Sequence, residues 1–267
     1  MPQIEIHCPS GLKGVVRGLR GEELDVFANR QEVQRRRVSR TVLTNCWVET
    51  LELGPAYEGR LSAEKLHMDK VLMCDRFYAL LQIRCATHGP QYDFRVQCSD
   101  PSCRKRYDWG LDINKDLPVY ELPDPSIECF RAENRFTAEI LNHEVTFKLQ
   151  VGEDEDTTVS AVQLSPTQQA TTALAQRVVS VLTPEGKLLD HKAEIRVWAK
   201  GLDVPDAMAL IDEMDLVDGG VETSIEIQCP HCGHMEDISL PLEGEFWTPQ
   251  RRRSTEGRKV RRPSRGS

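Results

Sequence analysis

The stretch IEIQCPHCGHMEDISLPL, residues 225–242, contains the pattern on which the predicted fold depends. Apolar and polar residues alternate on both sides of Cys229-Pro-His-Cys232-Gly, which is typical of two short strands joined by a turn. A pair of cysteines at such a turn can supply ligands to a structural zinc ion, which takes four thiolate or imidazole ligands in a tetrahedron. One hairpin cannot complete that set without crowding, so other ligands must come from elsewhere in the chain.

The same arrangement occurs earlier, in GPQYDFRVQCSDPSCRKRYDWGLDI, residues 89–113. In both copies a helical segment and a glycine precede an alternating strand, a cysteine, a spacer, a second cysteine and another alternating strand. The spacer has two residues in the later copy and four in the earlier one. We therefore predict two zinc-knuckle hairpins that share one structural zinc ion, held by Cys98, Cys103, Cys229 and Cys232.

The energy of such a site favours the shared arrangement. Joining the two hairpin tips closes a loop of about 126 residues, which costs roughly 4 kcal/mol in chain entropy. A structural zinc ion contributes roughly 10 to 16 kcal/mol, so the metal outweighs the closure cost.

Three other uses of the cysteine pairs remain open. Cys229, Cys232 and His234 could bind a metal locally with a fourth group from elsewhere. The pairs could be redox-active, although that motif normally opens a helix after a strand. They could also form disulfides if the protein leaves the cell, although an odd total of nine cysteines argues against a complete disulfide framework.

The composition is that of a folded protein. Of the 267 residues, 39% are hydrophobic and 28% are charged, close to the average for globular proteins. This length suits one large domain or two modest ones. No apolar run approaches the roughly 20 residues of a membrane helix, and residues 1–5 lack the basic flank and apolar core of a secretory signal. We expect a cytoplasmic location and no membrane partner.

The charge is unevenly distributed along the chain. The formal net charge is -8, but residues 251–265 carry eight cationic side chains against Glu256 alone, which is +7 and leaves -15 on the remainder. This basic arm could hold an acidic protein surface, nucleic acid or its own body. Its candidate partner-binding residues are Arg251, Arg252, Arg253, Arg258, Lys259, Arg261, Arg262 and Arg265.

Periodicity predicts an α+β fold, with a helical N-terminal part and two knuckle-hairpin halves joined by one zinc site. We expect a strand at 4–7, a glycine-rich turn or hairpin at 9–21 that matches no phosphate loop, helices at 22–53, 62–87 (broken near Met68), 165–182 and 203–214, strands within 136–150, and an acidic loop at 152–157. We divide the chain into segments 1–60, 61–125, 126–190, 191–249 and the extended arm 250–267.

No catalytic signature is evident in the sequence. Cys85 and His88 share a helix face, but that face must pack and no third partner is visible. The acidic run 153–156 could hold magnesium, although such a run is usually solvated. The lone cysteines are expected to be small buried residues: Cys8, Cys46, Cys74 and Cys129. We predict a protein with no small-molecule substrate.

Four stretches carry a family resemblance: LTNCWVETLELGP (43–55), DRFYALLQIRCATHGPQYDFRVQCSDPSC (75–103), AEIRVWAKGLDVPDAMALIDEMD (193–215) and TSIEIQCPHCGHMEDISLPLEGEFWTP (223–249). Together they resemble the bacteriophage baseplate protein family of the T-even type, over about residues 35–249. The four-residue spacer in the first knuckle departs from the usual two, and the arm after Pro249 lies outside the resemblance.

The resemblance implies a non-enzymatic component or assembly chaperone of the baseplate hub in contractile-tailed phages. Its partners would be other baseplate and tail proteins, in the host cytoplasm during assembly and in the virion tail if it is structural. The alternative is a zinc-ribbon factor that binds nucleic acid, which the paired cysteines and the arginine-rich arm favour. A body with a charge of -15 opposes that alternative, because it repels phosphate.

Overall fold

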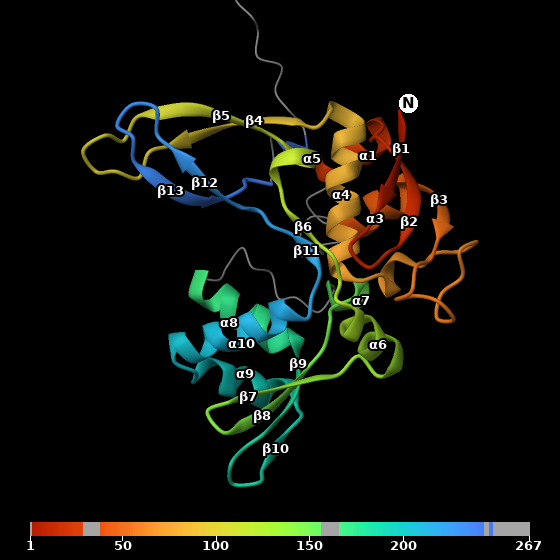
Figure 1. The fold of residues 1–267 in the computed structure, drawn as a ribbon, viewed down its shortest axis with the longest axis vertical. Coiled ribbons are helices and arrows are strands. Elements are labelled where there is room, and N and C mark those ends of the chain that lie inside the picture. Colours follow the sequence, from red (N-terminus) through yellow and green to blue (C-terminus); the bar gives the residue numbers. More distant parts are fainter. Residues whose placement is uncertain (1, 29–37, 156–165, 243–245, 248–267) are drawn as a thin grey trace, which may run out of the picture.

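The computed structural model describes residues 2–28, 38–155, 166–242 and 246–247, and gives side chains for all of these but 166–170. The basic arm at 251–265 therefore lies outside the described residues. The chain forms a mixed α+β fold with several small antiparallel sheets (Figure 1). None of the described helices is both long enough and apolar enough to cross a membrane.

The N-terminal region is a three-stranded antiparallel sheet packed against one side of the long helix α4 (Figure 1). The predicted strand and turn at residues 4–21 are confirmed as a hairpin. The predicted helical N-terminal part is only half correct, because strands and helices alternate there. The elements are β1 (Gln3–His7), β2 (Lys13–Arg17), α1 (Gly21–Ala28), α3 (Val38–Cys46), β3 (Trp47–Glu52) and α4 (Met73–His88).

The prediction of a helix as far as residue 53 is wrong. Helix α3 ends at Cys46, and β3 then pairs with β2 in antiparallel register. β-branched and aromatic residues favour strands, and the side chain of Trp47 packs on the neighbouring strand β2. Its indole lies over Gly14 of β2, where any Cβ would collide with the ring. The partner strand, which helical periodicity does not reveal, decides the conformation.

The start of the second predicted helix is also wrong. Residues 61–67 form no helix, a short 3₁₀ turn η1 covers Met68–Lys70, and α4 begins only at Met73. The chain is held extended before α4 because Leu72 N–H donates to Tyr57 Oη and Met73 N–H donates to Gln150 O, both at 2.9 Å. The predicted end of this helix is confirmed, because α4 stops at His88 and Gly89 follows with a φ of 84°.

Three residues of the acidic run, 153–155, are described, and they pair with separate cations rather than forming one magnesium site; Asp156 lies outside the described residues. Residues 152–155 of the predicted loop form the short helix α7 (Gly152–Glu155), and each of its three carboxylates contacts a different cation. Glu155 accepts from the buried Arg76 of α4 at 2.5 Å, and the other two pairs are Glu153 with Lys70 and Asp154 with Lys148. These contacts fasten α7 to the body of the protein.

A second body lies below the hairpins in Figure 1, where helices cover one face of a four-stranded sheet with the order β10-β9-β8-β7. The predicted helix 165–182 is wrong after Arg177, because Val178–Leu182 forms a strand that pairs with β8. The predicted strands at 136–150 and helix at 203–214 are confirmed. The elements are β7 (Phe136–Ile140), β8 (His143–Phe147), α8 (Pro166–Arg177), β9 (Val178–Leu182), β10 (Leu188–Leu189), α9 (Lys192–Lys200) and α10 (Val204–Leu216).

Short elements connect the two bodies. A two-stranded ladder joins chain segments about a hundred residues apart and leads from α10 toward the second knuckle. The elements are α5 (Ile113–Asp116), β6 (Val119–Tyr120), α6 (Asp124–Ala132) and β11 (Gly220–Val221). Leu122 and Phe130 from this region belong to the core around α4, so that core draws on several of the predicted segments. The division into five segments stays a prediction.

Asp218, at the end of α10, predicts a pH-dependent contribution to stability. Burial raises the pKa of its carboxyl, and the opposing effect of Arg177, whose Nη2 lies at 3.2 Å, leaves the net value at about 6. The folded protein keeps a proton that the unfolded chain gives up near pH 4, so stability falls as pH rises from about 4 to 6. We expect the unfolding free energy of Asp218→Asn, relative to that of wild type, to rise by at most about 3 kcal/mol over this pH range. Urea unfolding at several pH values measures the difference, and a difference independent of pH contradicts the prediction.

Candidate metal centre

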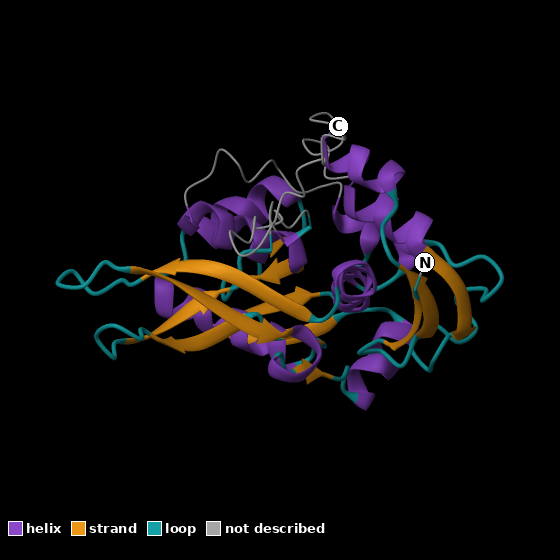
Figure 2. Ribbon diagram, turned by 90° about the horizontal axis from the view of Figure 1, so that it is seen from above, coloured by secondary structure: helices purple, strands orange, loops and turns teal. Residues whose placement is uncertain are grey.

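Two hairpins from opposite halves of the sequence lie side by side and project from the body (Figures 1 and 2). The strands of the first are β4 (Gln91–Gln97) and β5 (Arg106–Asp112), and those of the second are β12 (Ser224–Gln228) and β13 (Met235–Ser239). Alternate residues of β4 are buried, as the period-two pattern predicts. Phe94 and Ile227 pack in one core with Tyr107 beneath the cysteines. Both predicted hairpins are therefore confirmed.

The two turns share one backbone design despite their different lengths. The first cysteine of each donates its N–H across the turn, Cys98 to Lys105 O at 3.0 Å and Cys229 to His234 O at 2.8 Å. The residue after the second cysteine has a positive φ in both turns, 45° at Arg104 and 77° at Gly233. The two extra residues of the first spacer are accommodated within the turn, where Asp100 Oδ1 accepts from the N–H and the hydroxyl of Ser102.

The turns bring four thiols together, so every cysteine predicted as a ligand lies in one cluster. All four Sγ atoms lie within 4.8 Å of one another, with 3.6 Å from Cys98 to Cys232 and 3.9 Å from Cys103 to Cys229. A tetrahedron with Zn–S bonds of about 2.3 Å separates its sulfurs by about 3.8 Å. A disulfide requires about 2.05 Å, and these cysteines are free. The spacing fits a tetrahedral tetrathiolate site.

The environment of Cys229 favours ionisation of its thiol. Burial raises the pKa of Cys229, but hydrogen bonds from the N–H groups of His231 and Cys232 lower it by more. The net pKa is about 7. Burial raises the pKa of Cys98 to about 12. Four thiolates this close repel one another, so a bound cation is what would let all of them ionise together.

The side chain of His234 lies beside the cluster but not in it. Its Nε2 lies 3.0 Å from Ser99 Oγ, so the imidazole joins the two hairpin tips by a hydrogen bond. This geometry does not favour the local site of Cys229, Cys232 and His234. The redox alternative loses its structural basis too, because Cys229 and Cys232 lie in a hairpin and not at the start of a helix.

One comparison with known proteins identifies a family. The family model of the T4 bacteriophage base plate protein matches residues 18–244. The chain belongs to that family. No match was found among the curated proteins or among the solved structures. The matched residues include both hairpins, all four clustered cysteines and the intervening second body.

The other cysteines of this base plate family member are placed mostly as expected. Cys8, Cys46 and Cys74 are buried, whereas Cys129 is half-buried and donates to Arg135 O at 3.1 Å. Burial raises the pKa of Cys46 to about 11, which makes it a poor nucleophile.

The pair formed by Cys85 and His88 is not arranged for catalysis. Cys85 is buried, and its Sγ lies 3.8 Å from Asn114 Oδ1. His88 Nε2 instead lies 3.0 Å from Trp247 O. Each side chain is thus engaged with a different neighbour. The sequence interpretation also missed that the rings of Phe246 and Trp247 pack on the knuckle core. Their aromatic character was the signal that could have revealed it.

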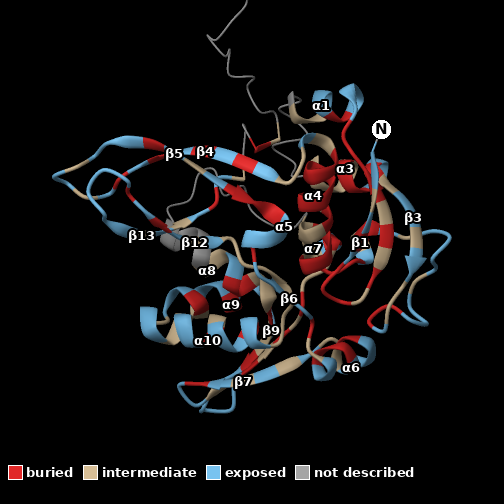
Figure 3. Ribbon diagram, turned by 45° about the horizontal axis from the view of Figure 1, so that its top comes forward, coloured by how far each residue is buried: buried red, intermediate tan, exposed pale blue. Residues whose placement is uncertain are grey.

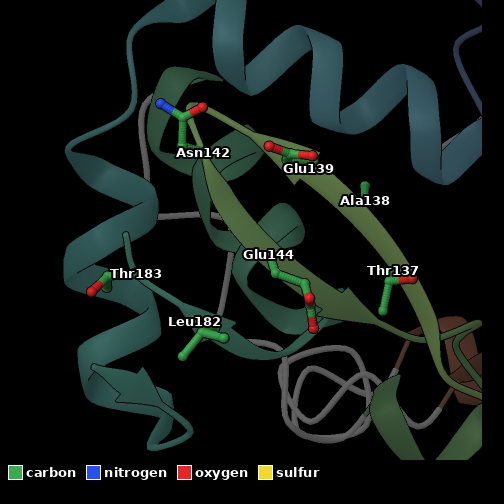
Figure 4. A pocket seen from close by; sticks show the side chains of 7 residues that line it. All are labelled: Thr137, Ala138, Glu139, Asn142, Glu144, Leu182 and Thr183. Carbon is green, nitrogen blue, oxygen red and sulfur yellow. The ribbon is translucent and has the colours of Figure 1, made fainter. Parts of the chain in front are cut away.

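One hollow on this base plate family member lies on the outer face of the second sheet. Figure 4 shows Glu139 and Glu144 on neighbouring strands, with Leu182 nearby. The two carboxylates are direct cross-strand partners, and both side chains are exposed. An exposed polar face is ordinary for an antiparallel sheet with one covered side. This hollow contains no paired nucleophile and base, and we assign it no activity.

Proposed function

We propose that this protein is a non-enzymatic component or assembly factor of the phage baseplate hub, stabilised by one structural zinc ion. Family membership supports a role in the phage baseplate. The observation that carries the zinc proposal is the cluster of four thiols delivered by two separate hairpins, with Sγ atoms at the spacing of a tetrahedral site. The proposed ligands are Cys98, Cys103, Cys229 and Cys232.

The metal would act as a clamp between the two halves of the chain. Its ligands are 126 residues apart at the closest pairing across the hairpins, and the second body lies between them in the sequence. A bound ion would fix the hairpin tips against each other and hold the flanking strands in one position. A rigid projecting arm of this kind can present a constant surface to neighbouring baseplate proteins.

The metal content can be measured directly. We expect one zinc ion per chain by elemental analysis, and a cobalt-substituted protein with the intense near-ultraviolet charge-transfer absorption of thiolate ligands. His234→Ala should keep the metal, because the imidazole bonds Ser99 and not the cluster. Loss of the ion in His234→Ala would instead support the local site, and a metal-free wild type purified under reducing conditions would remove the zinc proposal.

The nucleic-acid alternative is separated by binding at low salt. The knuckles carry acidic side chains, including the exposed Glu226 and Asp237 and the half-buried Glu236 of the second hairpin, which repel phosphate. We therefore expect weak filter retention of DNA or RNA by full-length protein, and none after removal of residues 250–267. Tight binding that survives this removal would favour the alternative.

The role within the baseplate is tested in the particle itself. The copy number of this chain relative to the tail tube protein, measured by mass spectrometry of purified virions, distinguishes two cases. A small fixed number identifies a structural component. Presence in infected cells with absence from virions identifies an assembly factor.

A further inference from the structure

Helix α10 is apolar on two opposite sides. Its inner side contributes Leu210 and Met214, both fully buried, to the core of the second body. Its outer side exposes Val204, Met208 and Leu216, with exposed fractions of 71%, 51% and 70%. Residues four apart share one helix face, so these three lie on a single line. Helices that are apolar all round are normally buried all round, whereas the outer side of α10 faces solvent in Figure 3.

The exposed face continues into a groove at the end of the helix. The last turn of α10 and the two-stranded ladder of β6 and β11 enclose a hollow of about 560 Å³. Leu216, Tyr120 and Val221 supply its apolar surface, and Tyr120 is 56% exposed. The rim is acidic, with Asp212 and Glu222 among its residues. The outer face and this hollow together form one surface, which we call the α10 groove.

The acidic charge of the α10 groove is only partly compensated. Between Lys200 and Arg251 the sequence has twelve Asp or Glu residues and no Lys or Arg. Arg177 reaches in from α8 and contacts Asp215 and Asp218. Within the part of the chain that the structure describes, Asp212, Glu213 and Glu222 form no ion pair, although Asp212 and Glu213 sit near a helix C-terminus, where carboxylates are unfavourable.

We propose that the α10 groove binds a basic amphipathic helix of another protein. Apolar residues spaced four apart on that helix would cover Met208 and Leu216, and its flanking Lys or Arg residues would pair with Asp212 and Glu213. The chain's own arm matches the charge but not the apolar face, because residues 251–265 include a single apolar side chain, Val260. This inference goes beyond the proposed function, since neither zinc nor a place in the baseplate enters it.

The probe is a synthetic amphipathic helix of about 18 leucine and lysine residues, titrated into the full-length protein at physiological salt. We expect binding by fluorescence anisotropy and slower hydrogen exchange at residues 204–222. Leu216→Lys should weaken binding at least about tenfold, because it places a charge in the apolar contact. The matched control is Leu188→Lys on β10, an exposed leucine outside the groove, which should leave affinity unchanged.

Two further peptides test both parts of the recognition. Replacing the leucines with serine, or the lysines with glutamate, should abolish binding. Equal affinity for the serine peptide would show charge attraction alone and overturn the proposal, as would protection away from α10 or an unchanged Leu216→Lys. The last test is zero-length crosslinking of the full chain without peptide. A link from Lys259 to Asp212 or Glu213 would identify the chain's own arm as the occupant and overturn the proposal. Zinc content enters none of these results.

Discussion

Replacing Cys229 with serine is expected to remove the zinc ion and to lower the melting temperature by at least about 10 °C. A structural zinc site contributes on the order of 10 kcal/mol, and 1 kcal/mol corresponds to roughly 2 to 4 °C in a protein of this size. Cys229 is fully buried and its pKa is lowered to about 7, so its loss leaves a three-thiol site without a readily formed thiolate. Elemental analysis and a thermal melt of the purified variant measure both effects.

The control for this variant is Cys129→Ser. Cys129 lies on α6 outside the cluster, and a serine hydroxyl can replace its thiol as donor to Arg135 O. We expect full zinc content and a melting temperature within about 2 °C of wild type, as is usual away from special features. A Cys229→Ser protein that kept both its zinc and its melting temperature would show that the four thiols are not the ligands.

Replacing Arg17 with methionine is expected to cost about 3 to 5 kcal/mol of unfolding free energy. Arg17 Nη2 lies 2.7 Å from Glu23 Oε1, and the Glu23 side chain has no exposed surface. Removing one partner of a buried pair leaves an unpaired charge in the interior, which costs far more than the pair itself contributes. Urea unfolding at pH 7 measures the loss.

The pH dependence and a neighbouring variant sharpen this test. Burial raises the pKa of Glu23, but the bonds from Arg17 and from Arg20 N–H lower it more, so the net pKa lies below its usual value. The wild type therefore loses stability as pH falls through that pKa, and the deficit of Arg17→Met should narrow toward pH 4. Lys13→Met is the control, because Lys13 on the same strand pairs with the exposed Glu52 and should cost under about 1 kcal/mol. Equal losses in both variants would contradict the expectation.

The candidate metal centre could be predicted because its information is local and repeated. Each hairpin carries its own alternation and its own pair of cysteines, so neither needs the other to be visible in the sequence. The end of α4 was predictable for the same reason, since Gly89 supplies a stop signal that depends on few neighbours. The relative placement of the hairpins followed only from the chemistry of a metal that needs four ligands.

The errors arose where distant neighbours decide the conformation. Residues Trp47–Glu52 and Val178–Leu182 fit a continued helix as well as a strand, and their partner strands β2 and β8 select the strand. The helices α6 and α9 were not predicted, although α9 has buried positions four apart at Ile195 and Ala199. The outer face of α10 was also missed, because apolar periodicity does not say which of two apolar sides the core covers.

The long separation of the two cysteine pairs has a consequence for the newly made chain. During translation, Cys98 and Cys103 leave the ribosome 126 residues or more before Cys229 and Cys232. At about 5 to 20 residues per second, the first pair waits roughly 6 to 25 seconds for its partners. In that interval the first knuckle is half of a chelate, exposed to oxidation and to pairing with a wrong thiol. Capture of the proposed metal would therefore require that both knuckles have been synthesised, and it would come after the second body has had time to fold between them.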